Sequence, residues 1–131
     1  MLLRPAFAGF EVEYATTNYD LAIREGINRI YLLPDSNRNQ PIRALYCLWR
    51  SWSIVRQANP DFIITTGALP GLFCVVVGRL MGAKTIWIDS IANSDRSSMS
   101  GACARWFSSL WLTQWEHLAK PSGPRYDGAL L

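Results

Sequence analysis

Two short segments, each with an unbroken apolar centre, constrain the fold of this chain more than any other feature. They are residues 61–66 (DFIITT) and residues 84–90 (KTIWIDS). Runs of this length without polar alternation are typical of strands that are buried on both faces of a parallel sheet. Gly67 ends the first run, and the sequence beyond it predicts a helix through Met81, which Gly82 ends.

The rest of the chain continues an alternation of strands and helices. Further strands are expected at 10–15, 28–33 and 110–114, and further helices at 41–58 and 100–109. Pro41 favours a helix start because its missing N–H is not needed in the first turn, and Asn59-Pro60 ends that helix. Strands that alternate with helices predict an α/β fold with a parallel, Rossmann-like sheet.

Length and composition indicate that residues 1–131 form one folded domain. The chain is long enough for one hydrophobic core, and half of its residues are apolar. Six Trp residues indicate more apolar surface than such a domain buries, and a partner or a membrane interface would cover the surplus. The net charge of +3, without a run of Lys or Arg, argues against nucleic-acid binding.

The cysteines and the apolar runs indicate in which compartment of the cell the chain is expected. Cys47, Cys74 and Cys103 are widely spaced and form no CxxC motif, which predicts neither a disulfide framework nor a metal site and fits the reducing cytoplasm. The first residues lack the apolar region of a signal peptide. The longest apolar run, 68–77, is about half of the ~20 residues that span a bilayer. The sequence therefore predicts a chain that can lie on a membrane without crossing it.

Ligands of open α/β sheets bind beyond the carboxyl ends of the strands, and three segments fall there. The first is the glycine turn at Gly67, which either approaches a ligand or is simply a tight turn. The second begins at Asp89 and Ser90, which either orient a sugar hydroxyl or cap the chain as it leaves the sheet. The third is residues 113–117 (TQWEH), whose side chains can bond or stack on a sugar but are equally compatible with ordinary surface.

The 41–58 helix carries an apolar stripe whose role the sequence leaves open. Ile42, Leu45, Trp49 and Trp52 recur at three- and four-residue steps on one side, and Arg43 and Arg50 line another side. Such a stripe can lie in a lipid interface or pack on the sheet. We favour packing on the sheet, and membrane contact is the alternative.

Four segments, read in order, resemble one protein family. They are 60–67 (PDFIITTG), 82–92 (GAKTIWIDSIA), 98–101 (SMSG) and 112–116 (LTQWE), followed by 126–128 (YDG). In the PssD and asparagine-linked-glycosylation-fourteen family, a PD strand with a glycine turn, an IES strand, an SlTG helix start and a QWpe strand exit follow in the same order. The resemblance covers essentially the whole chain.

The resemblance implies one half of a split GT-B glycosyltransferase, peripheral on the cytoplasmic face of the membrane. This half would bind a polyprenyl-diphosphate-linked acceptor and recruit a small catalytic subunit that carries the UDP-sugar site. It implies no metal and no cofactor. Catalytic roles would fall to Asp89 and Glu116. The candidate acceptor-binding residues are Gly67, Ser90, Asn93, Ser100, Gly101, Gln114, Trp115 and His117.

The chain departs from the family pattern in two places. Family members have Glu where this chain has Asp89 and an Arg near Asn93, so the reach of the carboxylate differs. Residues 1–7 (MLLRPAF) resemble the end of the family's first helix, so the first strand and its glycine-rich loop are expected to be missing from this sequence. In a doubly wound sheet that strand is central. Either the true start lies upstream of this sequence, or the chain is a fragment whose sheet must close up or borrow a strand. We favour a misplaced start or a truncation.

Two other functions are compatible with the same residues. The first is a non-catalytic scaffold that only anchors a self-sufficient partner. The second is a generic nucleotide-binding domain, which the lack of a GxGxxG motif or a P-loop disfavours.

Overall fold

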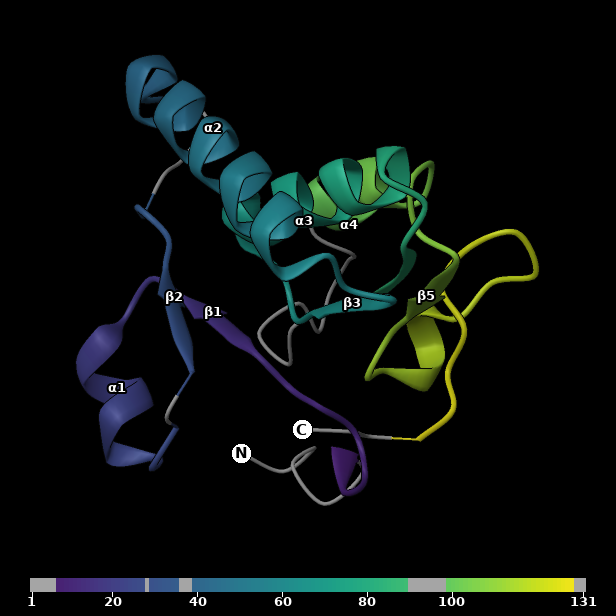
Figure 1. The fold of residues 1–131 in the computed structure, drawn as a ribbon. Helices are drawn as coiled ribbons and strands as arrows, with labels where there is room; N and C mark the ends of the chain where they lie inside the picture. The colour runs from purple at the N-terminus through teal and green to yellow at the C-terminus, as the bar shows by residue number, and fades with distance from the viewer. Residues whose placement is uncertain (1–6, 28, 36–38, 90–98, 129–131) are drawn as a thin grey trace.

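Parallel strands in two separate sheets form the centre of the protein (Figure 1). The computed structural model describes residues 7–27, 29–35, 39–89 and 99–128. One sheet pairs β1 (Tyr14–Thr16) with β2 (Ile30–Leu32). The other has the order β3-β4-β5, formed by β3 (Phe62–Thr65), β4 (Lys84–Ile88) and β5 (Leu110–Leu112). Every one of these pairs is parallel, which confirms the predicted α/β fold.

The two long helices begin and end where the sequence predicts. Helix α2 (Pro41–Ala58) has its proline in the first turn, and Asn59 caps its carboxyl end in the left-handed conformation at φ 45°. Helix α3 (Ala68–Leu80) follows Gly67, whose φ of 128° favours glycine. These bounds are local in origin, because proline and positive-φ residues end helices without help from distant parts of the chain.

The short elements differ more from expectation. Helix α1 (Tyr19–Arg24) was not predicted, although Asn18 caps it by accepting a hydrogen bond from the Leu21 N–H at 3.0 Å. Helix α4 (Met99–Ala104) ends five residues before the predicted Ser109. The chain turns there, with the Phe107 and Ser108 N–H groups donating to the Ala104 carbonyl, and the Thr85 hydroxyl in β4 donates to the Phe107 carbonyl at 2.7 Å. A 3-10 helix, η2 (Glu116–Leu118), follows β5, whose predicted extent to 114 was too long.

Helices α2, α3 and α4 lie together on one side of the three-stranded sheet (Figure 1). One core cluster beneath them joins Leu33, Ile54, Val55, Cys74 and Val77, with Tyr31 and Ile63 packed against it. Because Tyr31 belongs to β2 and Ile63 to β3, this cluster connects the two sheets on one face. Burial raises the pKa of the Cys74 thiol, and a hydrogen bond with Ser51 opposes this effect.

The predicted packing of the α2 apolar stripe on the sheet is wrong. Trp49 is 61% exposed and Trp52 is 44% exposed, and Ile42 and Leu45 are exposed as well. The buried face of α2 consists of Cys47, Ser51, Ile54 and Val55. The helix is therefore turned so that its aromatic side faces outward, because smaller side chains fit against α3.

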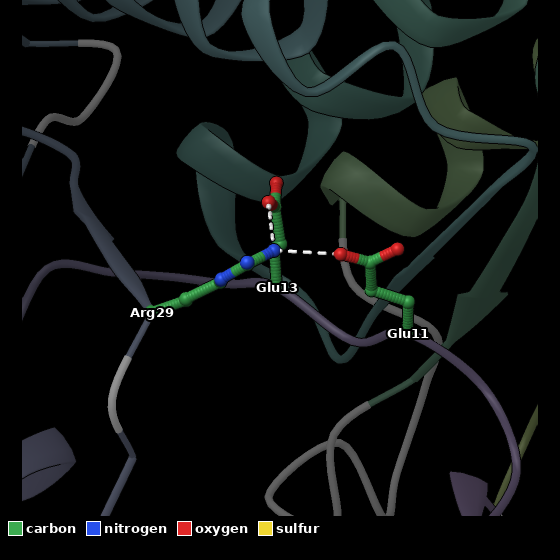
Figure 2. Close-up of polar contacts among 3 residues, drawn as sticks. All are labelled: Glu11, Glu13 and Arg29. Atoms are coloured by element: carbon green, nitrogen blue, oxygen red, sulfur yellow. Dashed lines mark hydrogen bonds and ion pairs between the residues drawn. The ribbon is translucent and has the colours of Figure 1, made fainter.

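An exposed ion-pair cluster lies at the beginning of the two-stranded sheet (Figure 2). The Arg29 guanidinium donates to Glu11 at 2.7 Å and to Glu13 at 3.4 Å, so the segment before β1 is tied to the segment before β2. Exposed pairs of this kind add little stability, because water screens them and ordering long side chains costs entropy. The cluster thus helps to set the register of β1 and β2 more than it holds the fold together.

Among the helices in the described residues, none combines the length and the apolar character needed to cross a bilayer.

Candidate functional site

The carboxyl ends of β3, β4 and β5 meet at one edge of the three-stranded sheet. Thr65 lies opposite Trp87, and Ile88 lies opposite Leu112. Continuing this register past the strand ends brings Gly67 and Asp89 to the same level. The ladder itself extends one residue beyond β4, because the Asp89 N–H donates to the Leu112 carbonyl at 2.9 Å. The three segments singled out in the sequence therefore leave the sheet side by side, where open α/β sheets bind ligands.

Asp89 is the centre of a buried polar network at this edge. Its side chain is fully buried, and its carboxylate accepts hydrogen bonds from the indole N–H groups of Trp87 at 2.9 Å and Trp111 at 3.3 Å. Its backbone carbonyl accepts from the Gln114 side-chain amide at 3.1 Å. A buried carboxylate needs such donors, because an unsatisfied charge in the interior is strongly destabilising. Asp89 thus links the ends of β4 and β5.

Residues after β5 form the second part of the site. Thr113 and Gln114 are buried, and the Thr113 hydroxyl accepts a hydrogen bond from the Trp115 N–H at 3.3 Å. Trp115 is half-buried, and its ring lies 6.0 Å from the ring of His117. This segment leaves the sheet with a fixed direction, and the Trp115 and His117 rings lie beside each other at its end.

Glu116 and His117 are exposed on η2, in contrast to the buried Asp89. An exposed carboxylate can reach a substrate that approaches this edge, whereas the Asp89 carboxylate is covered in the isolated chain. The two predicted catalytic carboxylates thus lie in very different environments.

The Gly67 turn lies at the same edge of the sheet, directly after β3. Gly67 and Ala68 both have positive φ values, 128° and 65°. One turn into α3, Gly71 packs so closely on Thr65 that a methyl group at this position would collide with the Thr65 side chain. The turn is therefore tightly built for structural reasons, and the glycine at 71 is required by the approach of α3 to β3.

The remaining predicted residues lie on or before α4. Ser100 is half-buried and Gly101 is buried in this helix, which packs on α3 and β4. Ser90 and Asn93 lie outside the described residues, so their place relative to Asp89 stays a prediction.

Trp87 and Trp111 belong to the network, and sequence reasoning missed them. Trp87 is fully buried with Val75 and Ala104, and Trp111 packs against the same cluster. A signal was present for the first of them. Trp87 and Asp89 are two residues apart in a strand, so their side chains point to the same face. Trp111 could not be found in this way, because it reaches Asp89 only through the pairing of β4 with β5.

Two surface hollows lie away from this edge. One is lined by residues near β1, among them Phe7, Val12 and Tyr14. The other runs along the outer side of α2, between Trp49, Trp52 and Arg56. Neither includes a predicted catalytic residue.

The fold has a well-defined relative among solved structures. The crystal structure of MurG from Acinetobacter baumannii is similar to this chain with a TM-score of 0.78 at 13% sequence identity, over 98% of this chain. The fold of this chain is therefore the Rossmann-like α/β fold found in part of MurG, a GT-B protein. The chain spans 40% of the length of MurG. No protein-family model matches the sequence, and the search of curated proteins gave no match. The similarity to the PssD and asparagine-linked-glycosylation-fourteen family therefore stays a resemblance in sequence motifs.

Proposed function

We propose that this chain is the acceptor-binding subunit of a two-component glycosyltransferase. In this proposal a small partner subunit holds a UDP-sugar, and the sugar moves to a polyprenyl-diphosphate-linked acceptor bound at the carboxyl edge of β3, β4 and β5. The observation that carries the proposal is the fold match, in which nearly the whole chain corresponds to 40% of a GT-B enzyme. The match covers one part of such an enzyme, and in this proposal the donor-binding part belongs to the partner.

The carboxyl edge supports this assignment through its chemistry. Transfer requires a base that takes the proton of the attacking acceptor hydroxyl, and a carboxylate can do so. Glu116 is exposed at the edge and fills this role in the proposal. Trp115 and His117 offer ring faces on which a sugar can stack. Asp89 then acts as a positioning residue, which fixes Gln114 and the β5 exit from beneath.

One observation favours the alternative of a non-catalytic scaffold. The Asp89 carboxylate is fully buried, and both of its oxygens are engaged by indole N–H groups. If Glu116 proves dispensable, the other predicted catalytic carboxylate is the buried Asp89, and the chain would serve only to anchor its partner.

A reconstituted transfer assay separates the two functions. The chain would be co-expressed with a small glycosyltransferase subunit encoded beside it, and the transfer of sugar from UDP-sugars to a polyprenyl-diphosphate acceptor would be measured in detergent. The acceptor-binding proposal expects activity from the pair and none from the partner alone. Equal turnover by the partner alone would establish the scaffold.

We further propose that the outer side of α2 contacts an anionic membrane. Between Pro41 and Ala58 the helix has no acidic residue, and its exposed stripe combines Trp49 and Trp52 with Arg56. Tryptophan rings favour the membrane interface, and arginines attract anionic lipid headgroups. The hollow between the two tryptophans and Arg56 adds a place for a headgroup.

Replacing Trp49 and Trp52 together by serine is expected to weaken vesicle binding at least tenfold, because the two rings supply most of the apolar area that enters the interface. Co-sedimentation with phosphatidylglycerol vesicles measures the effect. The control is Trp106→Ser, since Trp106 is 74% exposed but lies beyond α4. Binding that is equal for phosphatidylcholine vesicles, or unchanged in the double variant, contradicts the proposal.

A further inference from the structure

The hollow along the outer side of α2 has an aromatic half and a polar half. Trp49 and Trp52 form the aromatic half, and Ser53, Arg56 and Gln57 form the polar half. These positions are related by steps of three and four residues, so they lie on one side of the helix. Both tryptophans are exposed, as are Arg56 and Gln57, whereas Ser53 is half-buried. The hollow thus offers two rings and three polar side chains to a single bound group.

The polar half of the hollow contains hydrogen-bond donors that the described part of the chain does not use. No hydrogen bond or ion pair between described residues engages the side chains of Ser53, Arg56 or Gln57. The guanidinium presents a planar fork of N–H groups, the amide adds an NH₂ group, and the hydroxyl adds one O–H. Because α2 has no acidic residue, the charge of Arg56 is not neutralised within its own helix. The hollow is therefore suited to an anion.

The combination of rings and donors fits a phosphodiester with a glycerol group on each side. Two charged oxygens of a phosphodiester match the guanidinium fork, and their remaining lone pairs can accept from the hydroxyl and the amide. The glycerol groups would lie against the rings of Trp49 and Trp52, and tryptophan rings favour the boundary between water and lipid. The carboxyl end of a helix otherwise repels anions, so binding at this place depends on Arg56.

We propose that this hollow is a binding site for the phosphodiester headgroup of one anionic membrane lipid, in which Arg56 holds the phosphate and Ser53 and Gln57 donate further hydrogen bonds. The inference rests on the proposed contact of α2 with the membrane and goes beyond it. General attraction to an anionic surface depends on the number of basic charges near that surface. A built site depends also on the geometry of each donor. Substitutions that preserve charge therefore separate the two.

Charge-preserving variants of the full chain test the site by co-sedimentation with phosphatidylglycerol vesicles. Arg56→Lys keeps the charge but loses the fork, and we expect it to weaken vesicle binding by at least about threefold, because hydrogen bonds to charged groups are among the stronger ones. Ser53→Ala and Gln57→Ala each remove one donor without changing the charge, and both should weaken binding. Arg43→Lys is the matched control, since Arg43 is exposed on the same helix but does not line the hollow. Circular dichroism checks that each variant is folded.

A titration without vesicles tests the same site independently. The probe is glycerophosphoglycerol, the water-soluble headgroup of phosphatidylglycerol, and nuclear magnetic resonance follows the side-chain N–H groups of the chain. We expect saturable shifts at the Arg56 guanidinium, the Gln57 amide and the indoles of Trp49 and Trp52. The indole of Trp106 should not shift, because this exposed residue lies beyond α4. An equal concentration of inorganic phosphate should displace little of the probe, since it lacks the glycerol groups that contact the rings.

Three results would overturn the inference, and they differ in what they leave standing. Vesicle binding that is unchanged in Arg56→Lys, Ser53→Ala and Gln57→Ala would remove the site but keep the membrane contact of α2. A lack of vesicle binding by the unaltered chain would contradict both the site and the membrane contact. Full displacement of the probe by inorganic phosphate at equal concentration would show a site for free phosphate instead of a lipid headgroup.

Discussion

Replacing Trp87 by alanine is expected to lower the free energy of unfolding by about 3–5 kcal/mol, the range seen for large aromatic residues removed from a core. Trp87 is fully buried and packs on Val75 and Ala104. Its indole N–H also donates to Asp89 at 2.9 Å. The variant therefore loses apolar contacts, leaves a cavity and removes one of the donors that satisfy a buried carboxylate. Since whole domains are stable by only about 5–15 kcal/mol, this chain would be close to unfolding.

Urea denaturation followed by circular dichroism measures this effect. Trp106→Ala is the matched control, because Trp106 is largely exposed and its loss should change stability by no more than about 0.5 kcal/mol. Trp87→Phe keeps most of the volume and separates the lost hydrogen bond from the lost packing. A loss below about 1 kcal/mol for Trp87→Ala would contradict the burial of this side chain.

In the reconstituted pair, Glu116→Gln is expected to lower kcat by about 10²–10⁴-fold, the usual contribution of a general base. The amide keeps the size of the side chain but cannot accept the proton of the acceptor hydroxyl. Because Glu116 is exposed, the thermal stability of the chain should not change. The measurement is the initial rate of sugar transfer at saturating acceptor, with the melting temperature of each variant as a check.

Asp89→Asn is the informative companion, because its expected signature differs. An amide cannot accept hydrogen bonds from both indoles through two oxygens, so one indole N–H would lose its acceptor. We expect the free energy of unfolding to fall by about 1–3 kcal/mol. Transfer activity should fall as well, because the segment that follows β5 would be less well ordered. Full transfer activity in Asp89→Asn would remove Asp89 from the mechanism. Full activity in Glu116→Gln would leave the scaffold as the better description.

Elements set by local chemistry could be predicted from the sequence. The bounds of α2 follow from Pro41 and from the Asn59-Pro60 stop, and they agree with the structure at both ends. The core strands β3 and β4 follow from their apolar runs. Helix α1 was missed because six residues are too few to show helical periodicity, although Asn18 before it is a favourable N-cap.

The carboxyl edge could be located in advance, but the environments of its residues could not. Asp89 and Glu116 both follow strands and looked equivalent in the sequence. In the structure Asp89 is buried and bonded to two tryptophans, whereas Glu116 is exposed on η2. The difference arises from the pairing of β4 with β5, which carries Trp111 to Asp89 from 22 residues away in the chain.

The sequence by itself determined the order of the five strands and of helices α2, α3 and α4, where the long helices end, and the edge of the sheet at which a ligand site would lie. These are properties of neighbouring residues, because proline, glycine and side-chain alternation act within a few positions. Only the tertiary structure decided that α2 turns its tryptophans outward and that Asp89 is buried. These features depend on which distant segments of the chain pack together, because a side chain gains the energy of burial only when the segment that covers it is in place.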